Sequence, residues 1–257
     1  MPSLASRLAS ARLTGAAIHP EASELPATLD DAYAIQRAVA ALLGRDSDAW
    51  KVGSTSAEAQ RKLGTTEPGA ARVSARFRFQ SGDTVPVYAA HDLWVEAEFA
   101  LRLGADLPPR EAAYTKEEVA DAIDGIAPAL EIVGSRLAGG LSGAGRLMVT
   151  ADGSANVALV TGDVVADWRG FDLPGHAVRL IRNGTQEGSG AGANALGDPV
   201  NVMLWIANHQ RSRDGLKAGE MVSTGTCTGL IRVAPGDALA GDFGDIGTVT
   251  ARLEQAG

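Results

Sequence analysis

The sequence contains a single cysteine, Cys227, so no disulfide can form within the chain. One unpaired cysteine is typical of proteins that fold in a reducing compartment, and we expect a cytoplasmic location. No apolar run approaches the roughly 18 residues that a membrane span needs. The first twenty residues contain two arginines and no acid, as transit peptides do. The spacing of Leu4, Leu8 and Ala11 favours instead an ordinary amphipathic helix.

Basic residues are in the minority, because the chain has 23 Lys and Arg but 31 Asp and Glu, a net charge of −8. They are also scattered along the chain, which argues against nucleic acid or an anionic membrane as a partner. The four histidines have no metal-ligand spacing, and one cysteine is too few for a Cys/His zinc site. No G-x-S-x-G motif occurs. These absences leave the carboxylates as the main candidates for chemistry.

The glycine-rich stretch "GSGAGANALG" (188–197) contains a formal match to the dinucleotide-binding pattern G-x-G-x-x-A. That pattern should follow the first strand of a βαβ unit and open a helix, with an acidic residue about 20 positions further on. The stretch fails these conditions, since a separate cap, Asp198 before Pro199, starts the next helix. We therefore expect a loop that approaches a ligand or a neighbouring strand closely.

Helices are few, and each begins with an N-capping residue. Strands are more numerous and do not alternate regularly with the helices. This arrangement predicts an α+β domain around a mixed or antiparallel sheet. Helices are expected at 28–44, 115–126 and 198–210, after Thr28, Thr115 and Asp198 as caps. Strands are expected at 94–103, 127–135, 154–162, 176–184, 220–229, 231–239 and 247–255, with a hairpin at 76–88 that turns at 81–83.

Two glutamates, Glu96 and Glu98, lie two residues apart in the predicted strand "WVEAEFALRL". A strand places such residues on the same face, and here the other face is apolar. Glu131 is a lone acid in the apolar run "APALEIVGSR". Three carboxylates cannot stay ionised together without a cation, and Mg²⁺ prefers oxygen ligands of this kind. The alternative is the solvated polar face of an edge strand, and the spacing alone leaves both interpretations open.

Lys51 is also surrounded by apolar residues, between Trp50 and Val52 in "DAWKVGSTS". A lysine in such a setting can lose its proton near neutral pH and act as a base, or keep it and bind an anion. The alternative is a surface lysine with a packed stem.

Together these segments resemble the fumarylacetoacetate hydrolase superfamily, and within it the branch of 2-keto-4-pentenoate hydratases and 4-oxalocrotonate decarboxylases. The resemblance extends over nearly the whole chain and depends on the order and spacing of several pieces. It implies an α+β fold with a mixed, β-roll-like sheet of that family's C-terminal-domain type. We place a small helical N-terminal region at 1–75 and the catalytic domain at 76–257. The pieces are "WKVGSTS", "VEAEFALRL", "PALEIVGSR", "RNG", "LGDPVNVMLWIAN" and "STGTCTG...VAPGD".

The resemblance also implies a site, with a Mg²⁺ or Mn²⁺ ion held by an E-x-E pair and a third acid. From the glycine-rich stretch we add two candidates for substrate binding. Arg72, Arg136 and Arg182 are candidates for binding a distal carboxylate. The residues of the implied site are Glu96, Glu98 and Glu131 for the metal, Lys51 and Asp152 for catalysis, and Thr224, Gly225, Ser189 and Gly190 for substrate binding.

The activity implied is that of a homo-oligomeric hydratase that converts a small 2-hydroxy-2,4-dienoate, of the 2-keto-4-pentenoate type, to a 4-hydroxy-2-oxo acid. A decarboxylase of the 4-oxalocrotonate type and a non-catalytic relative remain alternatives. A carbon–carbon hydrolase would need a Glu/His pair that the histidines do not offer. The branch usually has Asp-x-Gly where this chain has Gly69 and Ala71, and "ADG" replaces "ADN". These departures leave the metal site intact and bear on the particular reaction.

Overall fold

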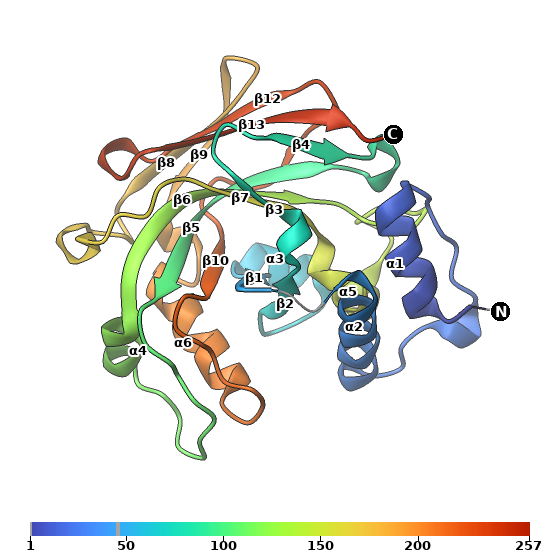
Figure 1. Cartoon of the computed structure of the whole chain (residues 1–257), viewed down its shortest axis with the longest axis horizontal. Coiled ribbons are helices and arrows are strands. Elements are labelled where there is room, and N and C mark those ends of the chain that lie inside the picture. Colours follow the sequence, from blue (N-terminus) through green and yellow to red (C-terminus); the bar gives the residue numbers. More distant parts are fainter. Residues whose placement is uncertain (1, 45–46) are drawn as a thin grey trace.

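Two β-sheets pack against each other in the computed structural model, which describes residues 2–44 and 47–257 (Figure 1). The larger is made of β1 (Ala49–Gly53), β2 (Gly69–Val73), β3 (Arg78–Gln80), β5 (Trp94–Leu103), β6 (Ile123–Val133), β7 (Asn156–Thr161), β10 (Met221–Thr226) and β11 (Ile231–Arg232). The smaller is made of β4 (Thr84–Val87), β8 (Ala177–Arg182), β9 (Thr185–Ala191), β12 (Ala238–Asp242) and β13 (Thr248–Gln255).

The larger sheet is mixed, in the order β2-β1-β10-β5-β6-β7-β3, with β11 also paired to β5. Strands β5 and β6 are antiparallel over their whole length, whereas β1 runs parallel to β10 and β3 runs parallel to β7. The smaller sheet has the order β4-β13-β12-β8-β9. The predicted α+β class with a mixed sheet is therefore confirmed.

The helices lie in two groups beside the sheets (Figure 1). One group contains α1, α2 and α5, and the other contains α4 and α6, while α3 follows β1. As predicted, Thr28, Thr115 and Asp198 cap their helices through side-chain hydrogen bonds. No helix in the described ranges is long and apolar enough to cross a membrane. The helices are α1 (Leu4–Thr14), α2 (Leu29–Leu43), α3 (Ala57–Leu63), α4 (Lys116–Ala122), α5 (Gly145–Ala151) and α6 (Pro199–Gln210).

Four local predictions were wrong. The strand expected at 231–239 is divided into β11, which pairs with β5, and β12, which pairs with β8 in the other sheet. Strands β3 and β4 do not form a hairpin, because β3 pairs with β7 and β4 pairs with β13 in the other sheet. The glycine-rich stretch begins as strand β9, which pairs with β8, rather than as a loop. Helix α4 ends at Ala122, since Ile123 already pairs with Leu103 in the larger sheet.

The two faces of the larger sheet differ in side-chain size. One face carries large apolar groups such as Phe99 and Leu130, which form the main core with residues of the smaller sheet. The other face carries alanines such as Ala100 and Ala129 in a separate small cluster. The sheet curls around this second face, which is also the face of Glu98 because side chains alternate along β5 (Figure 1). Small residues there leave room for polar groups inside the curl.

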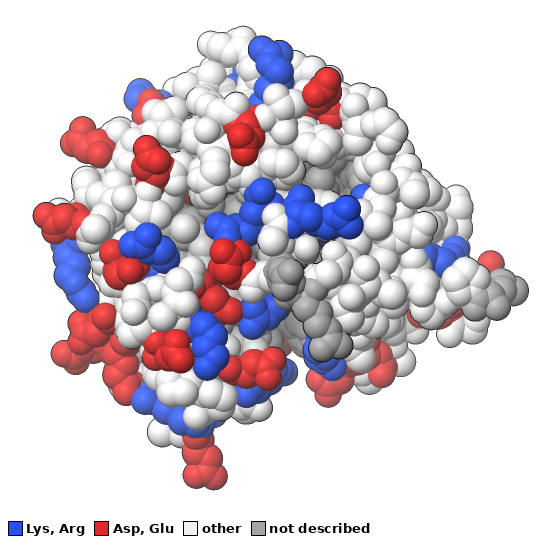
Figure 2. Space-filling view, in the orientation of Figure 1, with Lys and Arg blue, Asp and Glu red and all other residues white. Residues whose placement is uncertain are grey.

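Acidic and basic side chains are interspersed over the surface in Figure 2, apart from a short row of basic side chains near its centre. Strands β1 and β2 belong to the same sheet as β5 and β6. The division of the chain at residues 75 and 76 remains a prediction.

Candidate active site

Glu96, Glu98 and Glu131 come together on strands β5 and β6. These strands pair so that Glu96 lies opposite Glu131 and Glu98 lies opposite Ala129. One carboxylate oxygen from each glutamate lies within 4.8 Å of the others. Glu98 and Glu131 are fully buried and Glu96 is partly exposed. The interpretation as the solvated face of an edge strand is therefore wrong, because β5 and β6 lie in the interior of the sheet.

Each buried glutamate has one oxygen held by protein donors and one without a hydrogen bond. Glu98 Oε2 accepts hydrogen bonds from the Ser223 hydroxyl and, at 2.9 Å, from the backbone N–H of Gly225. Glu131 Oε1 accepts one from Asn156 Nδ2 at 2.8 Å. Glu98 Oε1 and Glu131 Oε2 are buried and accept none. Fixed carboxylates with one oxygen that accepts no hydrogen bond fit a hard divalent cation, although at Glu131 Oε2 the ion would compete with the Lys51 ammonium 3.3 Å away.

The pKa values of the three glutamates are also consistent with a cation site. Burial and repulsion by Glu131 raise the pKa of Glu96 to about 7. Burial, followed by the charges of Glu131 and Glu96, raises the pKa of Glu98 well above its usual range. Burial also raises the pKa of Glu131, although Lys51 opposes it. A group of carboxylates that resists ionisation is stabilised by either protons or a cation, so protons compete with metal ions here.

Lys51 lies on the same face of the sheet, on strand β1. Its Nζ is 3.3 Å from Glu131 Oε2 and donates a hydrogen bond to the Ser154 carbonyl at 2.7 Å. Burial alone would lower the pKa of Lys51, but the three glutamates outweigh it, and the pKa lies above the usual value. Lys51 therefore keeps its proton in this arrangement, which favours a proton donor or an anion-binding group over a base.

Gly225 is required for the backbone contact to Glu98. Its φ of +87° is a conformation that side chains rarely adopt, and a Cβ there would lie 1.9 Å from Thr55 Oγ1. The neighbouring Thr224 points away from Glu98, because its hydroxyl donates to the Phe99 carbonyl at 2.8 Å. Gly225 thus reaches the site through its backbone, whereas the structure does not bring the Thr224 side chain to the glutamates.

Asp152 does not face the glutamates either. Its two oxygens accept hydrogen bonds from Arg136, at 2.7 Å from Nε and at 3.0 Å from the backbone N–H. Both side chains are almost fully buried. Arg136 also donates to the Asn156 carbonyl at 2.9 Å. This ion pair fixes the turn that carries Ser154 and Asn156, so Asp152 acts on the site through the backbone.

Replacing Asp152 with alanine is expected to lower the free energy of unfolding by about 3–5 kcal/mol, because Arg136 is left buried without a partner. Denaturation in urea measures this loss. Asp121→Ala is the matched control, since Asp121 forms an exposed pair with Arg169 at 3.1 Å. The control is expected to cost at most about 1 kcal/mol. Equal losses in the two variants would contradict the structural role of Asp152.

Ser189 and Gly190 lie on β9 in the smaller sheet. A Cβ at Gly190 would lie 2.0 Å from the Cys227 carbonyl, so β9 approaches the chain that follows β10 closely. The expected close approach to a neighbouring strand is instead a close approach of strand β9 to the segment that follows β10. Their assignment to substrate binding remains a prediction.

Sequence reasoning missed several groups of the site. Ser223 and Asn156 hold the glutamates through their side chains, and the backbone carbonyl of Ser154 holds Lys51. The signal of the two side chains is a small polar residue inside a buried apolar segment, which is also found at many structural positions, and the backbone contact leaves no signal in the sequence. Such residues become informative only when pairing of the strands shows which of them meet.

Arg146 was also missed. A Cβ on Gly69 would lie 2.9 Å from its Nη1, so the absence of a side chain at Gly69 makes room for the guanidinium. Its Nη2 donates to the Pro68 carbonyl at 2.6 Å, its Nε is buried without a partner, and it forms no salt bridge with any described residue. By contrast, the arginines proposed from sequence are all paired with acids, Arg72 with Glu220, Arg136 with Asp152 and Arg182 with Glu187.

Residues 57–254 match the family described as fumarylacetoacetate (FAA) hydrolase C-terminal. The chain belongs to this family. A 2-keto-4-pentenoate hydratase of Paraburkholderia xenovorans (strain LB400) is 36% identical over 233 residues, which cover 88% of this chain and 84% of that protein. A 4-oxalocrotonate decarboxylase of Pseudomonas putida is 28% identical over 255 residues, which cover 97% and 95%.

Solved structures agree with this placement within the fumarylacetoacetate hydrolase family. The 4-oxalocrotonate decarboxylase from Pseudomonas putida G7, complexed with magnesium and adipate, has a TM-score of 0.87 and 27% identity, over 97% of this chain and 95% of that one. The fumarylpyruvate hydrolase from Pseudomonas aeruginosa, in complex with Mn²⁺ and pyruvate, has a TM-score of 0.62 at 16% identity, over 81% and 89%. The second similarity concerns the fold alone. The predicted hydratase and decarboxylase branch is confirmed.

Proposed function

We propose that the chain is a metal-dependent lyase that adds water to a 2-hydroxy-2,4-dienoate of the 2-keto-4-pentenoate type, giving a 4-hydroxy-2-oxo acid. One observation carries the proposal: Glu98 Oε1 is buried without a hydrogen bond, and Glu131 Oε2 beside it faces the Lys51 ammonium at 3.3 Å. Support also comes from the names of the relatives, among which hydratases predominate.

Glu96, Glu98 and Glu131 would hold Mg²⁺ or Mn²⁺. The ion would supply Lewis-acid stabilisation of negative charge on a substrate oxygen. The donors from Ser223, Gly225 and Asn156 fix the two buried carboxylates, so little reorganisation is needed during the reaction.

Lys51 is the proton donor of the proposal. Ketonisation of the dienol requires a proton at the far carbon before water adds to the conjugated double bond. In the metal-free protein Lys51 Nζ holds a proton, and it donates a hydrogen bond to the Ser154 carbonyl, which orients it. Asp152 and Arg136 position that carbonyl through the turn they stabilise.

A second candidate, decarboxylation of a 2-oxo dicarboxylic acid of the 4-oxalocrotonate type, is favoured by Arg146. Gly53 lies opposite Gly69 in the pairing of β1 with β2, and a Cβ on Gly53 would lie 3.0 Å from Lys51 Nζ. Opposite Cβ atoms in antiparallel strands are about 4.5–5.5 Å apart, so Arg146 Nη1 lies within roughly 12 Å of Lys51 Nζ. An unpaired guanidinium on this face of the sheet suits a distal carboxylate.

The deciding experiment gives the Mg²⁺-loaded protein 2-hydroxypenta-2,4-dienoate and, separately, 4-oxalocrotonate, with product mass as the readout. Gain of one water from the first substrate, abolished by EDTA, supports the hydratase. Loss of CO₂ from the second substrate with little hydration of the first supports the decarboxylase. No turnover of either by protein that binds Mg²⁺ supports a non-catalytic relative.

Arg146→Ala is expected to raise KM for a substrate with a distal carboxylate by roughly tenfold, since a charge-assisted hydrogen bond is lost. KM for the monocarboxylate dienoate should change little. Steady-state kinetics with both substrates measures the difference. Arg169→Ala, which removes an exposed arginine paired with Asp121, serves as the control. Equal effects of Arg146→Ala on KM for both substrates would rule out a role of Arg146 in binding the distal carboxylate.

A further inference from the structure

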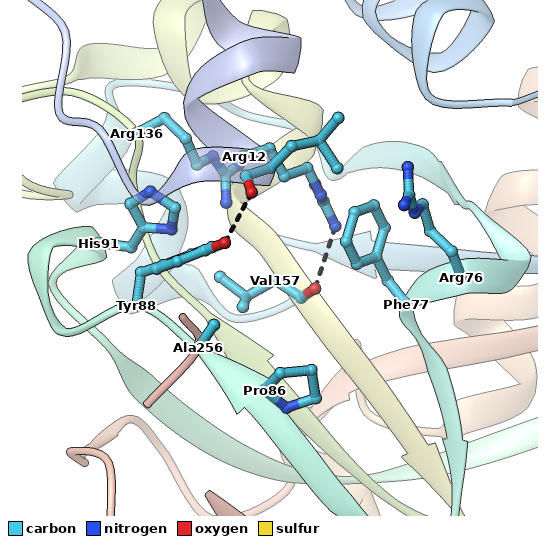
Figure 3. Close-up of a pocket in the computed structure, with 10 residues that line it drawn as sticks. Arg12, Arg76, Phe77, Pro86, Tyr88, His91, Arg136, Val157 and Ala256 are labelled. Carbon is cyan, nitrogen blue, oxygen red and sulfur yellow. Dashed lines mark hydrogen bonds between the residues drawn. The ribbon is translucent and has the colours of Figure 1, made fainter. Parts of the chain in front are cut away.

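A cavity of about 210 Å³ lies outside the candidate active site, between α1, β4 and the start of β7 (Figure 3). Neither the three glutamates nor Lys51 line it. Its walls combine three arginines and a histidine with apolar and aromatic groups. Its lining residues are Arg12, Arg76, Arg136, His91, Phe77, Tyr88, Leu13, Pro86, Val157 and Ala256.

The positive charge of this cavity is only partly compensated. Arg136 is paired with Asp152, whereas neither Arg12 nor Arg76 forms a salt bridge within the described part of the chain. Burial and repulsion by Arg136 lower the pKa of Arg12 to about 9. An anion beside Arg12 would offset both effects, because an opposite charge favours the ionised form.

Two buried nitrogens at the cavity lack hydrogen-bond partners. One is Arg12 Nε, and the other is Nε2 of His91, a residue that is only 1% exposed. Burial and the charge of Arg136 lower the pKa of His91 to about 4, so its ring is neutral at pH 7. Unpartnered buried polar atoms are uncommon and indicate water or a ligand at that position. A purely apolar void would stay empty, but this cavity is polar at one end.

The arginines are held in place by contacts other than carboxylates. The Arg12 guanidinium stacks 4.1 Å from the centre of the Phe77 ring, and that of Arg76 lies 5.7 Å from it. Figure 3 shows the Phe77 ring between the two guanidinium groups. Arg12 also donates to Asn156 Oδ1 at 2.8 Å and to the Val157 carbonyl at 3.1 Å. These contacts orient the charge without neutralising it.

We propose that this cavity binds a small carboxylic acid anion whose apolar body lies against Leu13, Pro86 and Val157. Its carboxylate pairs with Arg12, and the charge of Arg76 on the other side of the Phe77 ring adds to the attraction. The volume corresponds to roughly seven water molecules, which suits a compact acid rather than a nucleotide or cofactor. The apolar walls favour such an acid over inorganic phosphate. One side chain separates the site from the glutamates, since Asn156 accepts from Arg12 and donates to Glu131.

Isothermal titration calorimetry with benzoate, in EDTA, tests the proposal. EDTA removes metal ions, so benzoate cannot bind through a metal ion at the three glutamates, and the result does not depend on the proposed function. The expected result is saturable binding to one site, weakened about five- to tenfold by Arg76→Gln and more strongly by Arg12→Gln. Arg76 is exposed, so its variant is expected to fold normally. Arg61→Gln, an exposed arginine on α3 without a salt bridge in the described residues, should bind as the unaltered protein does.

A second readout localises the probe. Imidazole signals in a ¹⁵N–¹H spectrum report the four histidines, and His91→Gln assigns the one at the cavity. Benzoate should shift the His91 signal. Absence of saturable binding, binding that Arg76→Gln and Arg12→Gln leave unchanged, or phosphate binding as tight as that of benzoate would each overturn the proposal.

Discussion

Replacement of Glu98 with glutamine is expected to remove Mg²⁺ binding at the glutamates and to reduce turnover at least roughly 100-fold. Changes in groups that only support metal ligands already cost about 10–100-fold in metal affinity or activity, so loss of a ligand should cost more. Glutamine keeps the size of the side chain and can still accept the Ser223 and Gly225 hydrogen bonds. Calorimetric titration with Mg²⁺ and the mass-detected assay measure the two losses.

The stability of the same variant should change in the opposite direction when metal is absent. The pKa of Glu98 in the folded chain lies above its ordinary value of 4.5, so its contribution to stability is present below about that pH and is lost as the pH rises. Glu98→Gln removes this loss of stability at high pH, because a glutamine side chain does not ionise. In EDTA the variant is therefore expected to melt at a higher temperature than the unaltered protein at pH 8, with a smaller difference at pH 5.

Addition of Mg²⁺ should reverse the order, because only the unaltered protein gains stability by binding the ion. Glu254→Gln is the matched control, since Glu254 is an exposed glutamate on β13 and should behave as the unaltered protein in every condition. Undiminished Mg²⁺ binding by Glu98→Gln would contradict the assignment of the glutamates. A variant that melts lower than the unaltered protein in EDTA at pH 8 would show that Glu98 is a structural residue instead.

The glutamates could be predicted from sequence because two independent signals agree. The i, i+2 spacing of Glu96 and Glu98 fixes their common face, and a charged residue in an apolar run indicates a buried partner. Their meeting with Glu131 depends on the register of β5 with β6, which spacing alone does not give. The resemblance to a family supplied that step, and the pairing of Glu96 with Glu131 confirms the geometry.

Other features could not be predicted because they depend on pairing between distant segments. β3 and β4 have the pattern of a hairpin, but β3 pairs with β7 in the larger sheet and β4 pairs with β13 in the smaller one. The resemblance to the family assigns a catalytic role to Asp152, and only the structure shows that Arg136 donates hydrogen bonds to both of its oxygens. Arg146 lies near the site only because a glycine on β2 leaves space for it. In each case a local pattern is compatible with several long-range contacts, and packing selects one.

Replacement of Lys51 with methionine is expected to lower kcat by roughly 10²–10⁴-fold, the usual range for loss of a general acid. Methionine retains an unbranched apolar stem for the buried position but has no proton to donate. Mg²⁺ binding should persist or tighten, because the ammonium that lies 3.3 Å from Glu131 no longer competes for the carboxylates. This combination separates Lys51 from Glu98, whose variant loses both properties.

Lys51→Arg separates the positive charge of Lys51 from its role as a proton donor. Arginine keeps the positive charge but does not lose its proton in the working range, so it can pair with an anion and cannot serve as the acid. If kcat falls as far in Lys51→Arg as in Lys51→Met while Mg²⁺ binding is retained, proton donation is the function of this residue. Lys62→Met, which removes an exposed lysine paired with Glu58, is the control for loss of charge alone. A kcat in Lys51→Met within tenfold of that of the unaltered protein would show that another group donates the proton. Lys51 would then be only a counter-charge to Glu131.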